Sequence, residues 1–163
     1  MKADAPYGGL NQCAANHLPL TPLGFLQRAA LVHPDRPAVM YGPITRSWAQ
    51  TRERCMRLAS ALATQGLGRG DTVSILCPNT PAMLEAHFGV PLCGALLNTI
   101  NCRLDAQGVA FILRHAETRL LLVDREFSGV AAAAVAAALP ERTLPAATMS
   151  KRICRLRPPH ARW

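Results

Sequence analysis

The most constraining feature of this sequence is a set of three short apolar segments between Asp71 and Asp124, separated by stretches with helical patterning. The segments occupy residues 71–77, 95–100 and 120–123. Each is apolar on both faces of a strand, which is typical of parallel sheets whose crossover helices cover both sides. The sequence therefore predicts an α/β fold with a mostly parallel sheet and flanking helices.

Capping signatures mark the starts of several helices around these segments. Thr21 and Thr80 each precede a proline, which is favoured at the first helical position because the N–H that it lacks has no helical partner there. Ser47 and Gln50 have the spacing of a capping box, in which the serine bonds forward and the glutamine bonds back. Asp105 is placed to cap a further helix. We expect helices to follow each of these caps.

Shorter patterns complete the predicted elements. Residues 38–41 and 44–46 are expected to form two strands joined by a tight connection, and a last helix is expected over residues 128–139. The helix after Thr21 is expected to run to about residue 31 and to bury one apolar face. That face comprises Leu23, Leu26, Ala30 and Leu31.

Composition divides the chain into three predicted parts: an irregular lead-in over residues 1–20, a partial α/β domain over residues 21–139 and a disordered basic tail over residues 140–163. The net charge of +8 is concentrated in the tail, where five of the 18 lysines and arginines follow Ser150 without an acidic residue. This shift favours a tail that was not selected with the domain over a functional basic arm, and we do not expect a nucleic-acid partner.

Two residue types limit the possible chemistry, and the apolar segments limit the class of protein. Lys2 and Lys151 are the only lysines, so none in the predicted domain can clamp a phosphate or form a Schiff base. The six cysteines contain no Cys-x-x-Cys pair, and Cys55, Cys77 and Cys93 lie in apolar patterns, as reduced core thiols of intracellular proteins do. No segment approaches the ~20 apolar residues of a membrane span.

Two segments partly resemble phosphate-binding loops. Residues 66–70 contain three glycines, but they follow a helix and precede a strand, which is the reverse of a phosphate loop, so we expect a plain turn. Residues 78–81 lie at the carboxyl end of a strand and the start of a helix, where parallel sheets usually bind ligands. They contain no glycine, and we expect them to cap and turn the chain rather than bind a ligand.

The remaining polar candidates have ordinary structural interpretations. Asp124 and Glu126 follow a strand and could form an acid–base pair, but no nucleophile lies near them in the sequence, so we expect capping. His87 lies on an apolar helix and is expected to be packed and hydrogen-bonded. The five histidines, which show no metal-ligand spacing, are His17, His33, His87, His115 and His160. We therefore expect no catalytic, cofactor-binding or metal-binding residue in this chain.

Several segments, in order along the chain, together resemble the N-terminal part of the AMP-forming acyl-activating enzymes. The resemblance extends from Leu18 to about Leu139. Within the family, this sequence is most similar to the plant acid–CoA ligases that act on short- or medium-chain fatty acids or benzoate. The segments that carry it are residues 16–22, 25–30, 47–52, 57–62, 70–79, 88–89, 94–95 and 98–101. Arg46, before Ser47, stands where the family usually has an aromatic residue, and Cys102 where threonine is common.

This resemblance implies an incomplete fold, namely the first subdomain of the N-terminal domain of the adenylate-forming enzymes. In that family an acid and ATP give an acyl-adenylate and pyrophosphate, and coenzyme A then displaces AMP. A complete enzyme would bind ATP, Mg²⁺, CoA and a carboxylic acid. The family's phosphate loop, adenine segment and catalytic lysine have no counterpart here, so the resemblance transfers no catalytic residue and implies no cofactor for this chain itself.

Two functional expectations follow. The first is a truncated acid–CoA ligase that is inactive alone, with an exposed sheet edge through which it could self-associate. The alternative is a non-catalytic interaction module that partners a full-length relative. The family implies an intracellular location, in the cytoplasm or the peroxisome; this sequence ends Ala-Arg-Trp, without the Ser-Lys-Leu-like peroxisomal signal.

Overall fold

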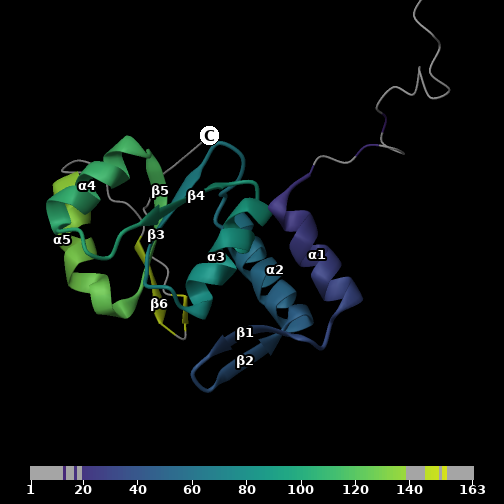
Figure 1. The fold of residues 1–163 in the computed structure, drawn as a ribbon. Coiled ribbons are helices and arrows are strands. Elements are labelled where there is room, and N and C mark those ends of the chain that lie inside the picture. Colours follow the sequence, from purple (N-terminus) through teal and green to yellow (C-terminus); the bar gives the residue numbers. More distant parts are fainter. Residues whose placement is uncertain (1–12, 14–16, 18–19, 139–145, 151, 154–163) are drawn as a thin grey trace, which may run out of the picture.

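The three apolar segments form neighbouring parallel strands, as the sequence predicts. In the computed structural model, which describes residues 13, 17, 20–138, 146–150, 152 and 153, they are β3 (Thr72–Leu76), β4 (Leu96–Ile100) and β5 (Thr118–Val123). β3 pairs with β4 on one side and with β5 on the other. The sheet order is β4-β3-β5-β6-β7, so β3 is an interior strand (Figure 1).

The predicted helices and the predicted hairpin are all present. Strand β1 pairs antiparallel with β2, and the helices α1 to α5 appear in the expected order, with a short 3-10 turn η1 before the last. Their bounds are α1 Pro22–Val32, β1 Pro37–Tyr41, β2 Ile44–Ser47, α2 Trp48–Thr64, α3 Pro81–Leu92, α4 Ala106–His115, η1 Arg125–Phe127 and α5 Ser128–Ala138. No helix of the described residues is long and apolar enough to cross a bilayer.

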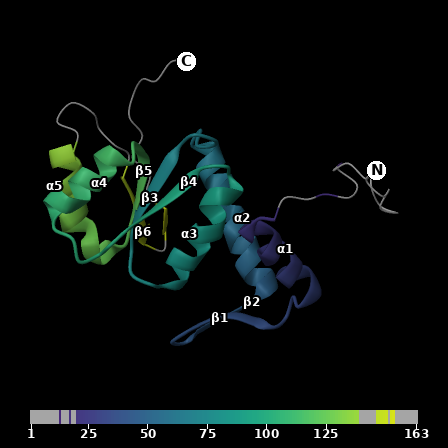
Figure 2. The same cartoon turned by 45° about the horizontal axis from the view of Figure 1, so that its top comes forward.

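Helices cover the sheet on both faces, which explains why its strands are apolar throughout. Alternate side chains of β3 and β5 face opposite ways. Val73 and Ile75 belong to the cluster formed with α2 and α3, whereas Leu76 and Leu121 belong to the cluster formed with α4 and α5. Figures 1 and 2 show these two helical layers on either side of the strands, with α1 lying outermost beside α2.

One polar group lies in the centre of the sheet. Ser74 on β3 is fully buried, and its hydroxyl lies 2.7 Å from the Thr118 hydroxyl of β5. The amide nitrogen of Asn98 on β4 donates to the same Ser74 oxygen at 2.9 Å. This bridge satisfies the hydroxyl that the buried strand carries and links all three parallel strands.

The structure corrects the prediction for the last segment. Residues 140–163 were expected to be disordered, but they include β6 (Ala146–Ser150), which pairs parallel with β5, and β7 (Arg152–Ile153), which pairs antiparallel with β6. The prediction of disorder is therefore wrong for these two strands. Backbone hydrogen bonds offered by β5 can define such a strand without any side-chain periodicity. The rest of that segment and most of the predicted lead-in lie outside the described residues.

The buried face of α1 is narrower than predicted. Leu26 and Ala30 are buried, but Leu31 is 83% exposed. Successive helical residues are rotated by about 100° from one another, so the side chain after Ala30 points away from the face that packs against α2.

Close packing at Gly89 of α3 generates a stability prediction. A Cβ atom there would lie 2.7 Å from Cδ2 and 2.9 Å from Cβ of Leu58 on α2. We expect Gly89→Ala to lower the free energy of unfolding by about 1–3 kcal/mol, as overpacking does. Urea denaturation followed by circular dichroism measures the change.

Gly24 of α1 offers the matched control, since nothing lies within 4 Å of a Cβ added there. Gly24→Ala should leave stability unchanged or raise it by up to about 1 kcal/mol through helix propensity. Equal effects of the two substitutions would contradict close packing of α2 against α3 at Gly89.

Candidate functional site

The carboxyl ends of β3, β4 and β5 meet at one edge of the sheet, where ligands commonly bind in parallel folds. The loop after β3 leads to α3 on one face, and the loop after β5 leads to α5 on the other, so the chain diverges between these two strands. Cys77 and Asp124 flank that point. Cys77 Sγ lies 3.8 Å from Asp124 Oδ2, and the Asp124 N–H donates to the Leu76 carbonyl at 2.9 Å.

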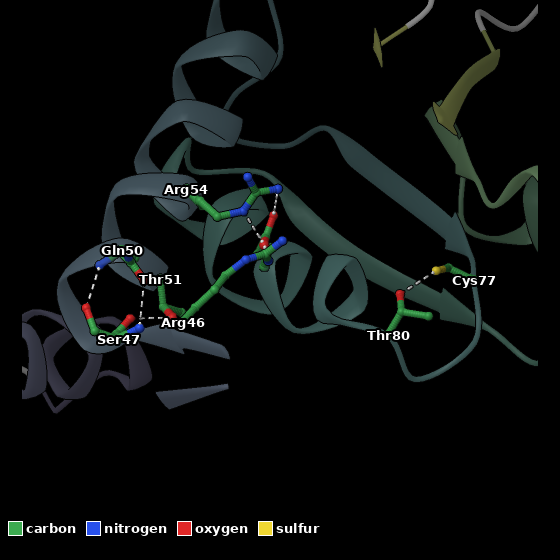
Figure 3. Close-up of polar contacts among 8 residues, drawn as sticks. Arg46, Ser47, Gln50, Thr51, Arg54, Cys77 and Thr80 are labelled. Carbon is green, nitrogen blue, oxygen red and sulfur yellow. Dashed lines mark hydrogen bonds and ion pairs between the residues drawn. The ribbon is translucent and has the colours of Figure 1, made fainter. Parts of the chain in front are cut away.

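The polar side chains at this edge are used locally. Asp124 accepts a hydrogen bond from the Glu126 N–H at 3.1 Å and so caps η1, which confirms its predicted role. Thr80 occupies the N-cap position of α3, but its hydroxyl makes no capping bond. It lies instead 3.4 Å from Cys77 Sγ (Figure 3). The prediction of a side-chain cap by Thr80 is therefore wrong, because the hydroxyl is turned back toward the strand end.

The two thiols of the edge are poor nucleophiles. Burial raises the pKa of Cys77 and outweighs the lowering by the Thr80 hydroxyl, and the negative charge of Asp124 adds to the rise. Burial likewise raises the pKa of Cys102, with Asp124 and Glu126 adding to it. Both thiols are protonated at neutral pH, and only a thiolate attacks efficiently.

The same edge does not fit the phosphates of ATP or a magnesium ion. Pro78 and Pro81 lack N–H groups, and the Thr80 N–H donates to the Pro78 carbonyl at 2.7 Å, so few backbone donors face outward. Among the described residues, no three histidines, cysteines or carboxylates gather in a way that could hold a metal ion. We therefore derive no reaction step through ATP or Mg²⁺ at this edge.

The glycine segment before β3 is a turn, as predicted. Gly66 and Gly70 have positive φ angles of 76° and 90°, which favour glycine. The Gly68 N–H donates to Asp71 Oδ2 at 2.8 Å, so a carboxylate of the chain takes the place that a phosphate would need. Arg119 Nη1 lies 2.6 Å from Asp71 Oδ1 and ties the turn to β5.

Other predictions have mixed outcomes. Ser47 and Gln50 form the predicted capping box of α2 (Figure 3). His87 is hydrogen-bonded, with Nδ1 2.8 Å from the Met83 carbonyl, but its side chain is exposed rather than packed as predicted. Cys55 and Cys77 are buried free thiols, in agreement with the predicted core role.

A buried ionic cluster was not predicted. Glu85 of α3 is only 8% exposed in its side chain, and its carboxylate binds the guanidinium groups of Arg46 on β2 and Arg54 on α2. Arg54 donates from Nε at 2.5 Å and from Nη2 at 3.0 Å. Figure 3 shows the side chains of Arg46 and Arg54 extending toward the same place. The one signal in the sequence was an acidic residue within an apolar helix.

The cluster affects the charge state of its neighbours. The hydrogen bond with Glu85 raises the pKa of Arg54 and outweighs its partial burial, so this guanidinium stays charged. Burial raises the pKa of the adjacent Cys55 to about 11, with the charge of Glu85 contributing. The cluster therefore holds two permanent positive charges around one buried carboxylate, and Cys55 beside it stays neutral.

Comparisons with known proteins identify relatives of most of this chain. Residues 26–156 match the family of AMP-binding enzymes, a match that continues past residue 139, where we predicted the domain to end. The peroxisomal acetate/butyrate–CoA ligase of Arabidopsis thaliana is 55% identical over 118 residues, which cover 72% of this chain and 21% of the relative. The peroxisomal benzoate–CoA ligase of the same plant is 49% identical over 119 residues, 73% of this chain and 20% of the relative.

Solved structures agree. A fatty acyl CoA synthetase of Mycobacterium tuberculosis superposes with a TM-score of 0.65 at 28% identity, over 68% of this chain and 23% of that protein. A benzoate CoA ligase of Burkholderia xenovorans shares the fold with a TM-score of 0.71 at 19% identity, over 78% of this chain and 25% of that protein. The chain thus spans about a fifth of the length of the curated relatives it matches.

The Glu85 cluster generates a stability prediction. Glu85→Gln leaves Arg46 and Arg54 facing each other without the anion that they share, so the variant should lose about 2 kcal/mol of unfolding free energy. The control Glu53→Gln breaks the exposed pair with Arg57 and should change the free energy of unfolding by less than about 0.5 kcal/mol. Urea denaturation of both variants measures the difference, and equal losses would contradict it.

The Asp71 turn generates a pH prediction. Burial alone would raise the pKa of Asp71, but the bonds from Arg119 and Gly68 outweigh it and hold the pKa below its ordinary value. Because the folded pKa is below the unfolded one, the stabilisation is fully present above about pH 4 and disappears as pH falls through the folded value. Asp71→Asn should therefore lower the free energy of unfolding by about 0.5–1 kcal/mol at pH 7, a small loss because Arg119 is nearly half exposed. The loss should become progressively smaller toward pH 2.

Thermal denaturation of the wild type and Asp71→Asn at pH 7 and pH 2.5 tests this. Arg119→Gln is the control, since it removes the main partner of the carboxylate and should flatten the same pH dependence. A stability difference between wild type and Asp71→Asn that stays constant with pH would refute the assignment.

Proposed function

The chain belongs to the AMP-binding enzyme family, and from this membership we propose that it is the first part of an acid–CoA ligase. The complete ligase would join a small carboxylic acid to coenzyme A at the expense of ATP, releasing AMP and pyrophosphate. The observation that supports the proposal best is the identity of about half of all aligned residues with plant acid–CoA ligases, over 118 and 119 residues of this chain.

We infer a structural rather than chemical role for this part. The thiols at the carboxyl edge are protonated, the loop after β3 offers few backbone donors, and no lysine lies between Lys2 and Lys151. These residues supply neither a nucleophile nor a site for phosphates. The chain alone is therefore inactive, and its contribution to the ligase is a scaffold on which the remaining four-fifths of the length of the relatives assembles.

The edge strand β4 supports a further part of the proposal. Among the described residues, β4 has a hydrogen-bonded strand neighbour on one side only, and Leu96 is 62% exposed. Its five residues carry no charge that would discourage pairing with another strand. The isolated chain self-associates through this edge. We also propose a location in the peroxisome or the cytoplasm, and the peroxisomal names of the two plant relatives support the former.

Acid-dependent ATP–pyrophosphate exchange tests the functional proposal. The purified chain should give no signal with acetate, butyrate or benzoate. A chimera in which residues 21–138 replace the matching segment of the Arabidopsis acetate/butyrate–CoA ligase should remain active. Its rate should stay within about tenfold of the parent, a cost of about 1.4 kcal/mol.

The two measurements separate the possible failures. Exchange by the isolated chain above an inactive-preparation control would overturn the scaffold role. A folded but inactive chimera would overturn equivalence with the first part of a ligase. Co-purification of the chain with an intact ligase would instead favour the non-catalytic interaction module.

A further inference from the structure

A pocket of about 360 Å³ lies where the turn of the β1–β2 hairpin meets the first half of α2. It is lined by residues of the hairpin and α2, none of which belongs to the carboxyl edge of the sheet. Its wall contains the three cationic side chains Arg46, Arg54 and Arg57 together with the amide of Gln50 and the carboxylate of Glu53. The pocket lacks aromatic side chains, so its lining suits a charged ligand rather than an apolar one.

The charges of the pocket do not balance. Arg46 and Arg54 share the single carboxylate of Glu85, and Arg57 pairs with Glu53 at 2.5 Å. Three guanidinium groups thus face two carboxylates, which leaves one positive charge uncompensated among these residues. Glu85 does not line the pocket, but its carboxylate binds the first two arginines, which together carry one more charge than it neutralises.

Hydrogen-bond donors remain available alongside this charge. Arg54 uses Nε and Nη2 for Glu85, and its Nη1 is a separate donor. Gln50 uses its carbonyl oxygen to accept from the Ser47 N–H, and its amide nitrogen carries two further N–H groups. The side chains of Arg57 and Glu53 are 71% and 60% exposed, and such a surface pair is worth less than about 1 kcal/mol, so a stronger anion displaces it.

From this arrangement we propose that the pocket formed by Arg46, Gln50, Arg54 and Arg57 binds a phosphate group. A phosphate carries up to two negative charges and enough oxygens to meet guanidinium groups from several directions. A carboxylate carries one charge and offers no more than Glu53 already supplies. The pocket is larger than a phosphate ion, so it accepts either free phosphate or the phosphate of a small ester. The site is independent of the proposed ligase function, because it uses none of the residues of the carboxyl edge.

Isothermal titration of the full chain at constant ionic strength, with inorganic phosphate and with glycerol 3-phosphate as probes, tests the site. Arg57→Gln should weaken binding at least fivefold, because it removes a donor of the pocket without touching the buried cluster. Arg52→Gln is the matched control. It removes an equal charge from an exposed α2 position outside the pocket and should change affinity less than twofold. Glu53→Gln should tighten binding about threefold, since it frees Arg57.

The outcomes of these titrations either support or overturn the proposed phosphate site. Binding that depends on Arg57 but not on Arg52 supports the site, and a tighter complex with glycerol 3-phosphate than with phosphate identifies an ester as the ligand. Equal affinities for the two probes identify the free ion. Absence of binding to both probes overturns the proposal. Equal weakening by Arg57→Gln and Arg52→Gln also overturns it, because the attraction would then come from the general charge of α2. Circular dichroism of each variant verifies that the fold is retained.

Discussion

The whole structure depends on the burial of β3 from four directions. Its backbone is bonded to β4 and β5 on its two sides, and its two faces are covered by α2 and α3 and by α4 and α5. Val73 and Ile75 have no exposed surface, and the Ser74 hydroxyl finds its partners within the sheet. Because its residues from Val73 to Leu76 are all buried, β3 tolerates only apolar or fully hydrogen-bonded side chains there.

The position of the sheet edge and its chemistry have separate origins in this chain. Crossovers on opposite faces place Cys77 beside Asp124 at the point where parallel folds commonly bind ligands. The side chains at that point nevertheless close on one another: the thiol contacts a hydroxyl and a carboxylate, and the carboxylate caps the following turn. Topology therefore creates the location, but the side chains that this chain places there serve its own local contacts and capping.

Local and non-local interactions differ in how far they could be predicted. The capping box of Ser47 and Gln50 and the turn before Asp71 involve neighbours within a few residues, so their spacing in the sequence was sufficient. Contacts between distant segments leave no such spacing. Glu85 lies 39 residues from Arg46 and 31 from Arg54, and β6 pairs with the backbone of β5, which lies in a distant part of the sequence. Thr80 is a residue type favoured at the N-cap, but its hydroxyl contacts Cys77 Sγ instead of capping the helix.

The Glu85 cluster also has a consequence for how this protein can change over evolutionary time. One carboxylate on α3 serves two guanidinium groups from β2 and α2, so no single replacement leaves the remaining members satisfied. Loss of Glu85 would leave two guanidinium groups without their shared anion. Loss of one arginine would leave the nearly buried carboxylate with less compensating positive charge. The three positions are therefore energetically coupled: the cost of replacing one of them depends on which residues occupy the other two.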